Sequence, residues 1–265
     1  LSDPTKRPPH LLEPIDPETL SFQPAEEICL DASIFMNCLR AARRGVAGGT
    51  SGSKNEHYKV VLDLEGTSDL FFAAAARLAK AQLPEEISEA LALARLTALA
   101  KPNGKVRGIA TGDSFRRLVA RSLAKQYAED LERACEPFQF ALSTRAGADC
   151  LTHLLRFLTD RDPWATISII DGIGAFDHVR RRRMLAKLRQ VPSASAALPF
   201  VRLFYARTST YMWWDEDGVA HEIAQGEGGE QGDPLMPALF ALGQHEALVA
   251  ARAQLQPDDF LGAYL

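Results

Sequence analysis

One acid in this sequence, at the end of an apolar run, has a position well suited to chemistry. Asp171 follows the run TISII at 166–170, which is too short for a helix of its own and predicts a buried or half-buried strand. Gly172 and Gly174 then let the chain turn closely past whatever the carboxylate binds. Two interpretations stay open here, because such an acid can be a metal ligand or the cap of the next turn.

Basic residues gather in a predicted hairpin and in the helix that follows it. The runs LTALA and VRGIA at 96–110 flank an Asn-Gly pair, a strong signal for a β-turn. Asp113 is the predicted N-cap of a helix from Ser114 to about Ala134. Such a cluster predicts phosphate binding, and the helix arginines at 116, 117 and 121 are predicted to contact nucleic acid, although the helix alone would indicate a solvated surface. Its members are Lys101, Lys105 and Arg107 on the hairpin and Arg116, Arg117, Arg121 and Lys125 on the helix.

Two glycine-rich loops could bring backbone amides close to a ligand. GEGGEQGDP at 226–234 precedes an apolar helix, for which Asp233 is the predicted N-cap and Pro234 the first helical residue. Gly48 to Lys54 forms the second loop, but it lacks the spacing of a P-loop, which favours a flexible connection.

Composition predicts a folded, soluble, intracellular protein. The 265 residues are 46% hydrophobic and carry a formal net charge of −4, which excludes dominant disorder and a uniformly basic nucleic-acid coat. The four cysteines show no zinc-site spacing and are expected to be reduced and packed. Neither a signal peptide nor a membrane-spanning run is evident, so no membrane partner is expected.

Hydrophobic periodicity predicts an α+β chain. Residues 1–24 contain six prolines and predict an extended Pro-rich linker without compact structure. A helical N-terminal region is expected over 25–95. Further predicted elements are helices at 146–159 and 180–190, strands at 209–214 and 219–225 joined around an Asp-Gly turn, a helix after Pro234, and an apolar strand at 260–265. The arginines of the 180–190 helix could follow a nucleic-acid backbone, but they more commonly mark a solvated face.

The order of these motifs resembles the fingers and palm of reverse transcriptases, with non-LTR retrotransposons as the nearest type. KPNGKVRGIA, IIDGIGAFDHV, GEQGDPLMPALF and a final aromatic-Leu strand follow one another at the spacing of that family. The resemblance implies a right-hand polymerase fold over 96–265, with a helix-backed antiparallel sheet. It also implies template-primed synthesis of DNA on an RNA template with a DNA primer, deoxynucleoside triphosphates and two Mg²⁺ ions.

The resemblance also gives individual residues a role. Asp171, with the carbonyl of Gly172, is implied as a magnesium ligand and catalytic acid. Phe176 is implied to stack under the incoming sugar and exclude a 2′-hydroxyl. Nucleotide binding is further implied for Gln231, Gly232, Lys101, Lys105 and Arg107, and Asp177 is expected to anchor its turn rather than to bind metal.

One departure from the family pattern limits the expected activity. The family has two adjacent acids directly after the aromatic-X pair, and this sequence stops at Tyr264-Leu265; the thumb is absent as well. The chain as given is therefore expected to be a fragment that does not polymerise. Two alternatives are a decayed or domesticated polymerase fold that only binds nucleic acid or protein, and an organellar intron-type reverse transcriptase.

Overall fold

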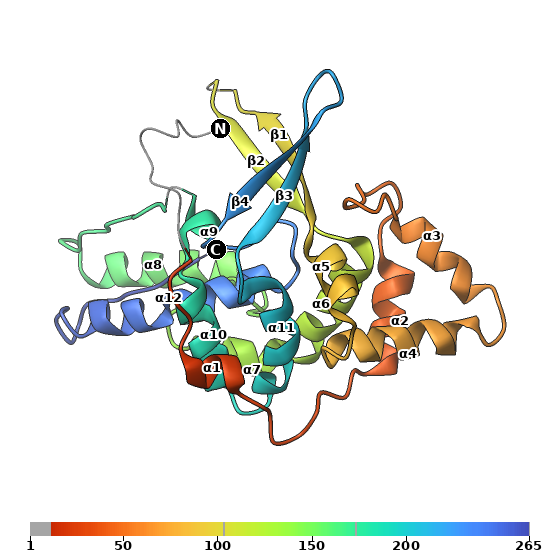
Figure 1. The fold of residues 1–265 in the computed structure, drawn as a ribbon. Helices are drawn as coiled ribbons and strands as arrows, with labels where there is room; N and C mark the ends of the chain where they lie inside the picture. Colours follow the sequence, from red (N-terminus) through yellow and green to blue (C-terminus); the bar gives the residue numbers. More distant parts are fainter. Residues whose placement is uncertain (1–11, 103, 173, 265) are drawn as a thin grey trace.

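Two β-hairpins project from a helical body in the computed structural model (Figure 1). The structure describes residues 12–102, 104–172 and 174–264. The first half of the chain forms α1 (Pro17–Ser21), α2 (Ala32–Ala41), α3 (Asn55–Lys59), η1 (Val60–Leu62), α4 (Thr67–Ala79), α5 (Glu85–Ala92), β1 (Ala94–Ala100), β2 (Val106–Thr111), α6 (Ser114–Gln126) and α7 (Ala128–Arg133). The second half forms α8 (Gly147–Arg161), α9 (Ala175–His178), α10 (Arg181–Arg189), η2 (Ala194–Ala197), α11 (Leu198–Tyr205), β3 (Ser209–Trp214), β4 (Ala220–Gln225) and α12 (Met236–Arg252).

Most of the helices share one hydrophobic core, and together with the four-stranded sheet they confirm the α+β class. On the N-terminal side, Phe35 of α2 is fully buried and its ring lies 5.7 Å from Phe71 and 5.8 Å from Phe72 of α4. Asp31 caps α2 by accepting a hydrogen bond from the Ile34 amide at 2.7 Å. Helices α10, α11 and α12 build the other side of the core. The hairpins have a second, smaller hydrophobic cluster of their own, formed by Ala94, Ala110 and Tyr211.

The sheet is mixed, which corrects the expectation of an antiparallel palm sheet. Its strand order is β2-β1-β3-β4, and both outer pairs are antiparallel hairpins. The central pair is parallel, with Ala94 opposite Tyr211 and Arg95 opposite Met212. The physical reason is that β1 and β3 both leave the helical body in the same direction, after α5 and after α11 (Figure 1).

The predicted helices and hairpins form close to their expected positions, with one break. The helix expected from Ser114 divides at Tyr127 into α6 and α7. Asp113 caps α6 as predicted, because its side chain accepts from the Phe115 amide at 2.8 Å. The loop at 48–54 rests on this cap, where the hydroxyl of Ser51 donates to the Asp113 carboxylate at 2.5 Å.

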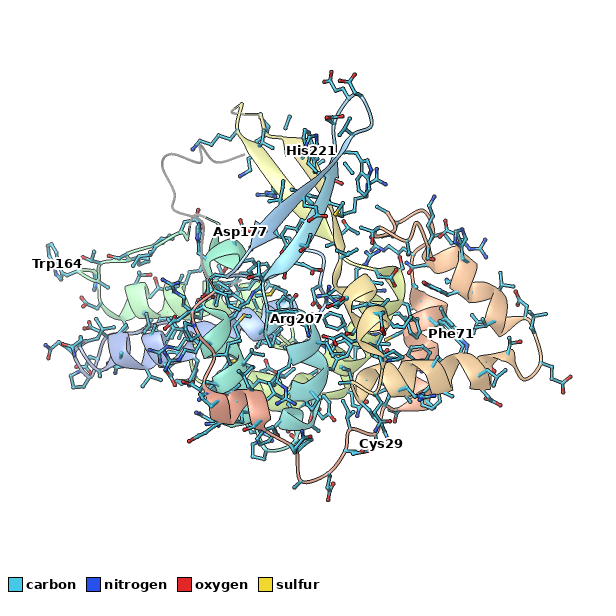
Figure 2. All side chains as sticks on the ribbon, viewed as in Figure 1. Cys29, Phe71, Trp164, Asp177, Arg207 and His221 are labelled. Carbon is cyan, nitrogen blue, oxygen red and sulfur yellow. The ribbon has the colours of Figure 1, made fainter. Side chains whose placement is uncertain are left out.

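The strand predicted before Asp171 does not form. Residues 165–172 belong to no helix or strand and make no β-ladder within the described residues. Ile169 and Ile170 are 88% and 95% exposed, and Trp164 stands at one edge of the molecule (Figure 2). A β-branched run becomes a strand only where a partner offers a ladder, so composition alone predicted wrongly here.

The strand expected at 260–265 is reduced to a single bridge. Ala263 pairs in parallel with Gln139, and its amide donates to the Phe138 carbonyl at 2.8 Å. Leu265 lies outside the described residues. The connector expected at 138–145 thus supplies the partner for this short pairing.

The described part of the Pro-rich segment is docked rather than free, which corrects the expectation for 12–24. Thr19 of α1 is fully buried and Ile15 is 7% exposed. Arg202 of α11 donates to three carbonyls of the segment, those of Thr19, Leu20 and Phe22. Acids of the same segment also pair with α10, as Arg182 with Asp16 at 2.9 Å and Arg189 with Glu18 at 3.0 Å. Basic side chains of α10 therefore bind acids of this chain.

No helix in the described ranges is both long and apolar enough to cross a membrane. The expectation of four packed cysteines holds for Cys38 and Cys135, which are buried, whereas Cys29 and Cys150 are exposed. Burial raises the pKa of the Cys135 thiol to about 12.

Native alkylation at pH 8 should therefore modify Cys29 and Cys150 and spare Cys38 and Cys135, because only an accessible thiolate reacts quickly. Intact-mass and peptide mass spectrometry would count and locate the adducts. Unfolding in urea is the control and should expose all four cysteines. Rapid modification of Cys135 in the folded chain would contradict this packing.

Candidate functional site: the 226–233 loop and its neighbours

The glycine-rich loop at 226–233 is almost entirely buried. Residues 226–230 and Asp233 are buried, Gly232 is half-buried, and Gln231 is the exposed residue of the loop. Three of the buried residues are acids, with Glu227 and Glu230 each 1% exposed and Asp233 5% exposed. Burying three carboxylates is costly unless they are paired, so the loop depends on its partners.

The loop is joined through its backbone to the turn that contains Phe176. The Gly228 amide donates to the Val179 carbonyl at 2.9 Å, and the Gly229 amide donates to the Phe176 carbonyl at 2.8 Å. Gly228 has φ of +74°, and a Cβ there would lie 2.5 Å from the carbonyl oxygens of Phe176 and Asp177. Only glycine permits this approach. Figure 2 shows Asp177 where the hairpins meet the helical body.

The loop also lies against the end of β2. A Cβ at Gly232 would stand 3.0 Å from the Ala110 carbonyl oxygen, and a Cβ at Gly112 would stand 2.7 Å from Glu230 Oε2. Three motif segments that are distant in the sequence are therefore in contact: β2 with the start of α6, the turn at 174–179, and the loop at 226–233.

A single guanidinium binds the acids on both sides of Gln231-Gly232. Nη1 of Arg116 donates to Glu230 Oε1 at 2.8 Å, and Nη2 lies 3.4 Å from Asp233 Oδ2. The hydroxyl of Tyr205 donates to the same Asp233 oxygen at 2.6 Å. The Arg116 guanidinium also lies over the ring of Phe204, 3.9 Å from its centroid. We call Arg116, Glu230, Asp233 and Tyr205 the arginine clamp.

Electrostatics keep the arginine of the clamp charged. Burial lowers the pKa of Arg116, but its interactions with Glu230, Tyr205 and Asp233 outweigh this effect and raise the pKa above its ordinary value. Burial raises the pKa of Glu230, and the nearby guanidinium opposes that rise. Burial also raises the pKa of Tyr205, which keeps its hydroxyl protonated as a donor.

A second buried arginine secures the start of the loop. Arg181 is fully buried, and its Nε donates to the Gly228 carbonyl at 2.7 Å. Its backbone amide donates to Glu227 Oε2 at 2.8 Å, while Oε1 of the same carboxylate accepts from the Glu13 amide at 2.7 Å. Glu227 therefore links the loop, α10 and the N-terminal segment.

The structure separates the predicted nucleotide-binding residues into two groups. Gln231, Gly232 and Phe176 lie around the loop, where the half-buried Phe176 ring is 5.1 Å from that of Phe240. Lys105 and Arg107 are exposed and Lys101 is half-buried on the projecting hairpin, with Arg107 opposite Leu99. Asn103 of the predicted turn lies outside the described residues.

Asp171 and Gly172 are exposed and lie in the segment without secondary structure. Among the described residues, no group of three or more His, Cys, Asp or Glu side chains is arranged to hold a metal ion. One carboxylate and one carbonyl are too few ligands for a two-magnesium centre. That centre does not fit the described residues by themselves.

The three arginines predicted to contact nucleic acid have different environments. Arg116 is 1% exposed and engaged in the clamp, so the prediction of nucleic-acid contact is wrong for it. Arg117 is half-buried and donates to the Ala47 carbonyl at 2.6 Å. Arg121 is half-buried, and its role stays a prediction. The reason for the error is that a charge count along a helix ignores which face each charge occupies.

Sequence reasoning missed the clamp, although the sequence contains a signal for it. Arg116 precedes the buried Ala120 and Leu123 at i+4 and i+7, the spacing of an inward helix face. Arg181 precedes Leu185 and Leu188 in the same way. Basic residues on buried faces, together with acids every third residue in a glycine-rich loop, indicate internal ion pairs.

Comparison with known proteins adds a relationship to mobile elements. No protein-family model matches the chain. Over 227 residues, or 85% of its length, the chain is 24% identical to the retrotransposable element SLACS 132 kDa protein of Trypanosoma brucei gambiense. The aligned part is 19% of that relative, so the chain spans about a fifth of its length. The similarity indicates a retroelement-related protein.

Arg116→Met should lower the free energy of unfolding by about 3–5 kcal/mol, because it leaves Glu230 and Asp233 buried without their counter-charge. Urea denaturation followed by circular dichroism measures the change. Arg133→Met is the matched control, since Arg133 is 69% exposed in its pair with Asp130 and should shift stability by at most about 0.5 kcal/mol. Equal losses in the two variants would contradict the clamp.

Proposed function

We propose that this chain is the fingers and part of the palm of an RNA-directed DNA polymerase from a retroelement. In this proposal it binds an RNA template, a DNA primer and a deoxynucleoside triphosphate. The proposal is supported most by the junction of β2, the turn at 174–179 and the loop at 226–233, which brings Phe176 and Gln231-Gly232 into one region. The 24% identity to a retrotransposable element protein agrees with it.

The proposed roles follow from chemistry and exposure. Gln231 offers an exposed amide that can donate to and accept from a base or sugar, beside the closely packed Gly232. Lys101, Lys105 and Arg107 offer cations on a projecting hairpin, and a guanidinium binds phosphate oxygens in a two-point manner. Phe176 is proposed as the residue that selects deoxyribose.

Magnesium stays a proposed cofactor of the complete enzyme. Asp171 and the Gly172 carbonyl are proposed to contribute ligands. Among the described residues, no cluster of His, Cys, Asp or Glu side chains supplies the remaining ligands. We therefore expect this chain alone to bind nucleotide and primer–template but not to catalyse DNA synthesis.

Binding is tested by titrating a labelled RNA–DNA primer–template and then a deoxynucleoside triphosphate, with magnesium present. Arg107→Ala should weaken nucleotide binding by roughly 10- to 100-fold, the loss expected when one charge-assisted contact to phosphate is removed. Arg207→Ala is the control, because Arg207, in the connection between α11 and β3, is 55% exposed and pairs with Glu89 of α5. Absence of any nucleotide or primer–template binding by the unaltered chain would refute the proposal.

Catalysis is tested by primer extension on an RNA template with magnesium. The chain as given should add no nucleotides above background, because the described residues assemble no metal centre. Resolution of products on a denaturing gel detects single additions. Clear extension by this chain would show that the ligand set is complete without further residues.

A further inference from the structure

The buried acids that flank Gln231-Gly232 suggest that contacts inside the protein hold the exposed glutamine in place. Glu230 precedes the pair and Asp233 follows it, and both carboxylates reach the same guanidinium. The loop makes no regular secondary structure at these positions, so backbone ladders do not fix the position of Gln231. We propose that Arg116 is a positioning residue that fixes Gln231 in its exposed position by binding the carboxylates on both sides of it.

Arg116 makes more contacts than a single ion pair would, and these contacts fix the orientation of its guanidinium. Its guanidinium is a planar fork that reaches Glu230 at 2.8 Å and Asp233 at 3.4 Å, and Phe204 covers one face at 3.9 Å. Tyr205 fixes the Asp233 carboxylate from a different element, at 2.6 Å. The four side chains of the arginine clamp therefore attach the loop to helices α6 and α11.

The same contacts connect the loop to the hairpin. Arg116 lies in the first turn of α6, directly after β2, and Glu230 Oε2 lies so close to Gly112 that a Cβ there would be 2.7 Å from it. We therefore expect a shift of β2 to displace Arg116 and the two carboxylates beside Gln231. This link would coordinate the phosphate-binding hairpin with the loop, and its functional meaning rests on the proposed function.

Arg116→Lys separates the role in positioning from the role of charge. Lysine keeps the positive charge, but its single ammonium cannot reproduce the two-point contact of a guanidinium. Hydrogen–deuterium exchange measured by mass spectrometry should be faster in the 226–235 peptide of this variant and unchanged in peptides of α2 and α4. Arg202→Lys is the matched control, because the Arg202 side chain also makes three hydrogen bonds, and among the described residues these go to carbonyls of the N-terminal segment.

Nucleotide titration then tests the consequence for binding. Arg116→Lys should raise the Kd for the deoxynucleoside triphosphate on the order of tenfold or more and leave the Kd for primer–template within about twofold, because a displaced loop affects only the ligand it contacts. A merely structural arginine would weaken both Kd values together. Glu230→Gln, which preserves shape and removes charge, should give the same selective effect and serves if Arg116→Lys does not fold.

The outcomes distinguish this inference from the proposed function. Unchanged exchange in the 226–235 peptide of both variants, or equal weakening of both ligands, overturns the positioning role. If the unaltered chain binds no nucleotide, the proposed function fails, and the exchange measurement alone decides whether Arg116 positions Gln231.

Discussion

Burial of the three carboxylates of the 226–233 loop is the constraint on which the centre of this structure depends. Glu227, Glu230 and Asp233 are each at most 5% exposed, and a charge in such surroundings requires a counter-charge and hydrogen bonds. Arg116 of α6 supplies the counter-charge for Glu230 and Asp233. Glu227 is paired with Arg180 at 3.7 Å and accepts from the backbone amide of the buried Arg181 at the start of α10. These contacts join the loop to α6 and to the start of α10, because each of the three carboxylates has its partner on a neighbouring element.

Both hairpins are attached to this buried centre. β2 runs directly into α6, whose first turn carries Arg116, and Ser209 at the start of β3 accepts from Arg181 at 2.8 Å. The first hairpin therefore ends, and the second begins, beside a buried arginine, and the two hairpins extend outward side by side (Figure 1). The first hairpin and the loop that carries Gln231 are therefore attached to the same buried contacts around Arg116.

The basic side chains of α10 form ion pairs within the chain, which the composition of this helix does not indicate. The arginine run of this helix pairs with acids of the N-terminal segment and of α12, including Arg182 with Asp16 and Arg183 with Glu246. Exposed ion pairs of this kind each contribute about 0–1 kcal/mol, and together they orient the segment against the helix. Glu227 extends the same network to the loop through the Glu13 amide.

The sequence by itself determined the local elements and the order of the motifs, while the tertiary structure decided which side chains face inward. Apolar spacing located α10, β3 and β4, and Asp113 marked the start of α6, because caps and periodicity act within a few residues. Burial of Arg116, the parallel pairing of β1 with β3, and the exposure of Ile169 and Ile170 depend on partners far along the chain. A β-branched run becomes a strand, and a helical arginine becomes a clamp, only when the fold places a ladder or a carboxylate beside it.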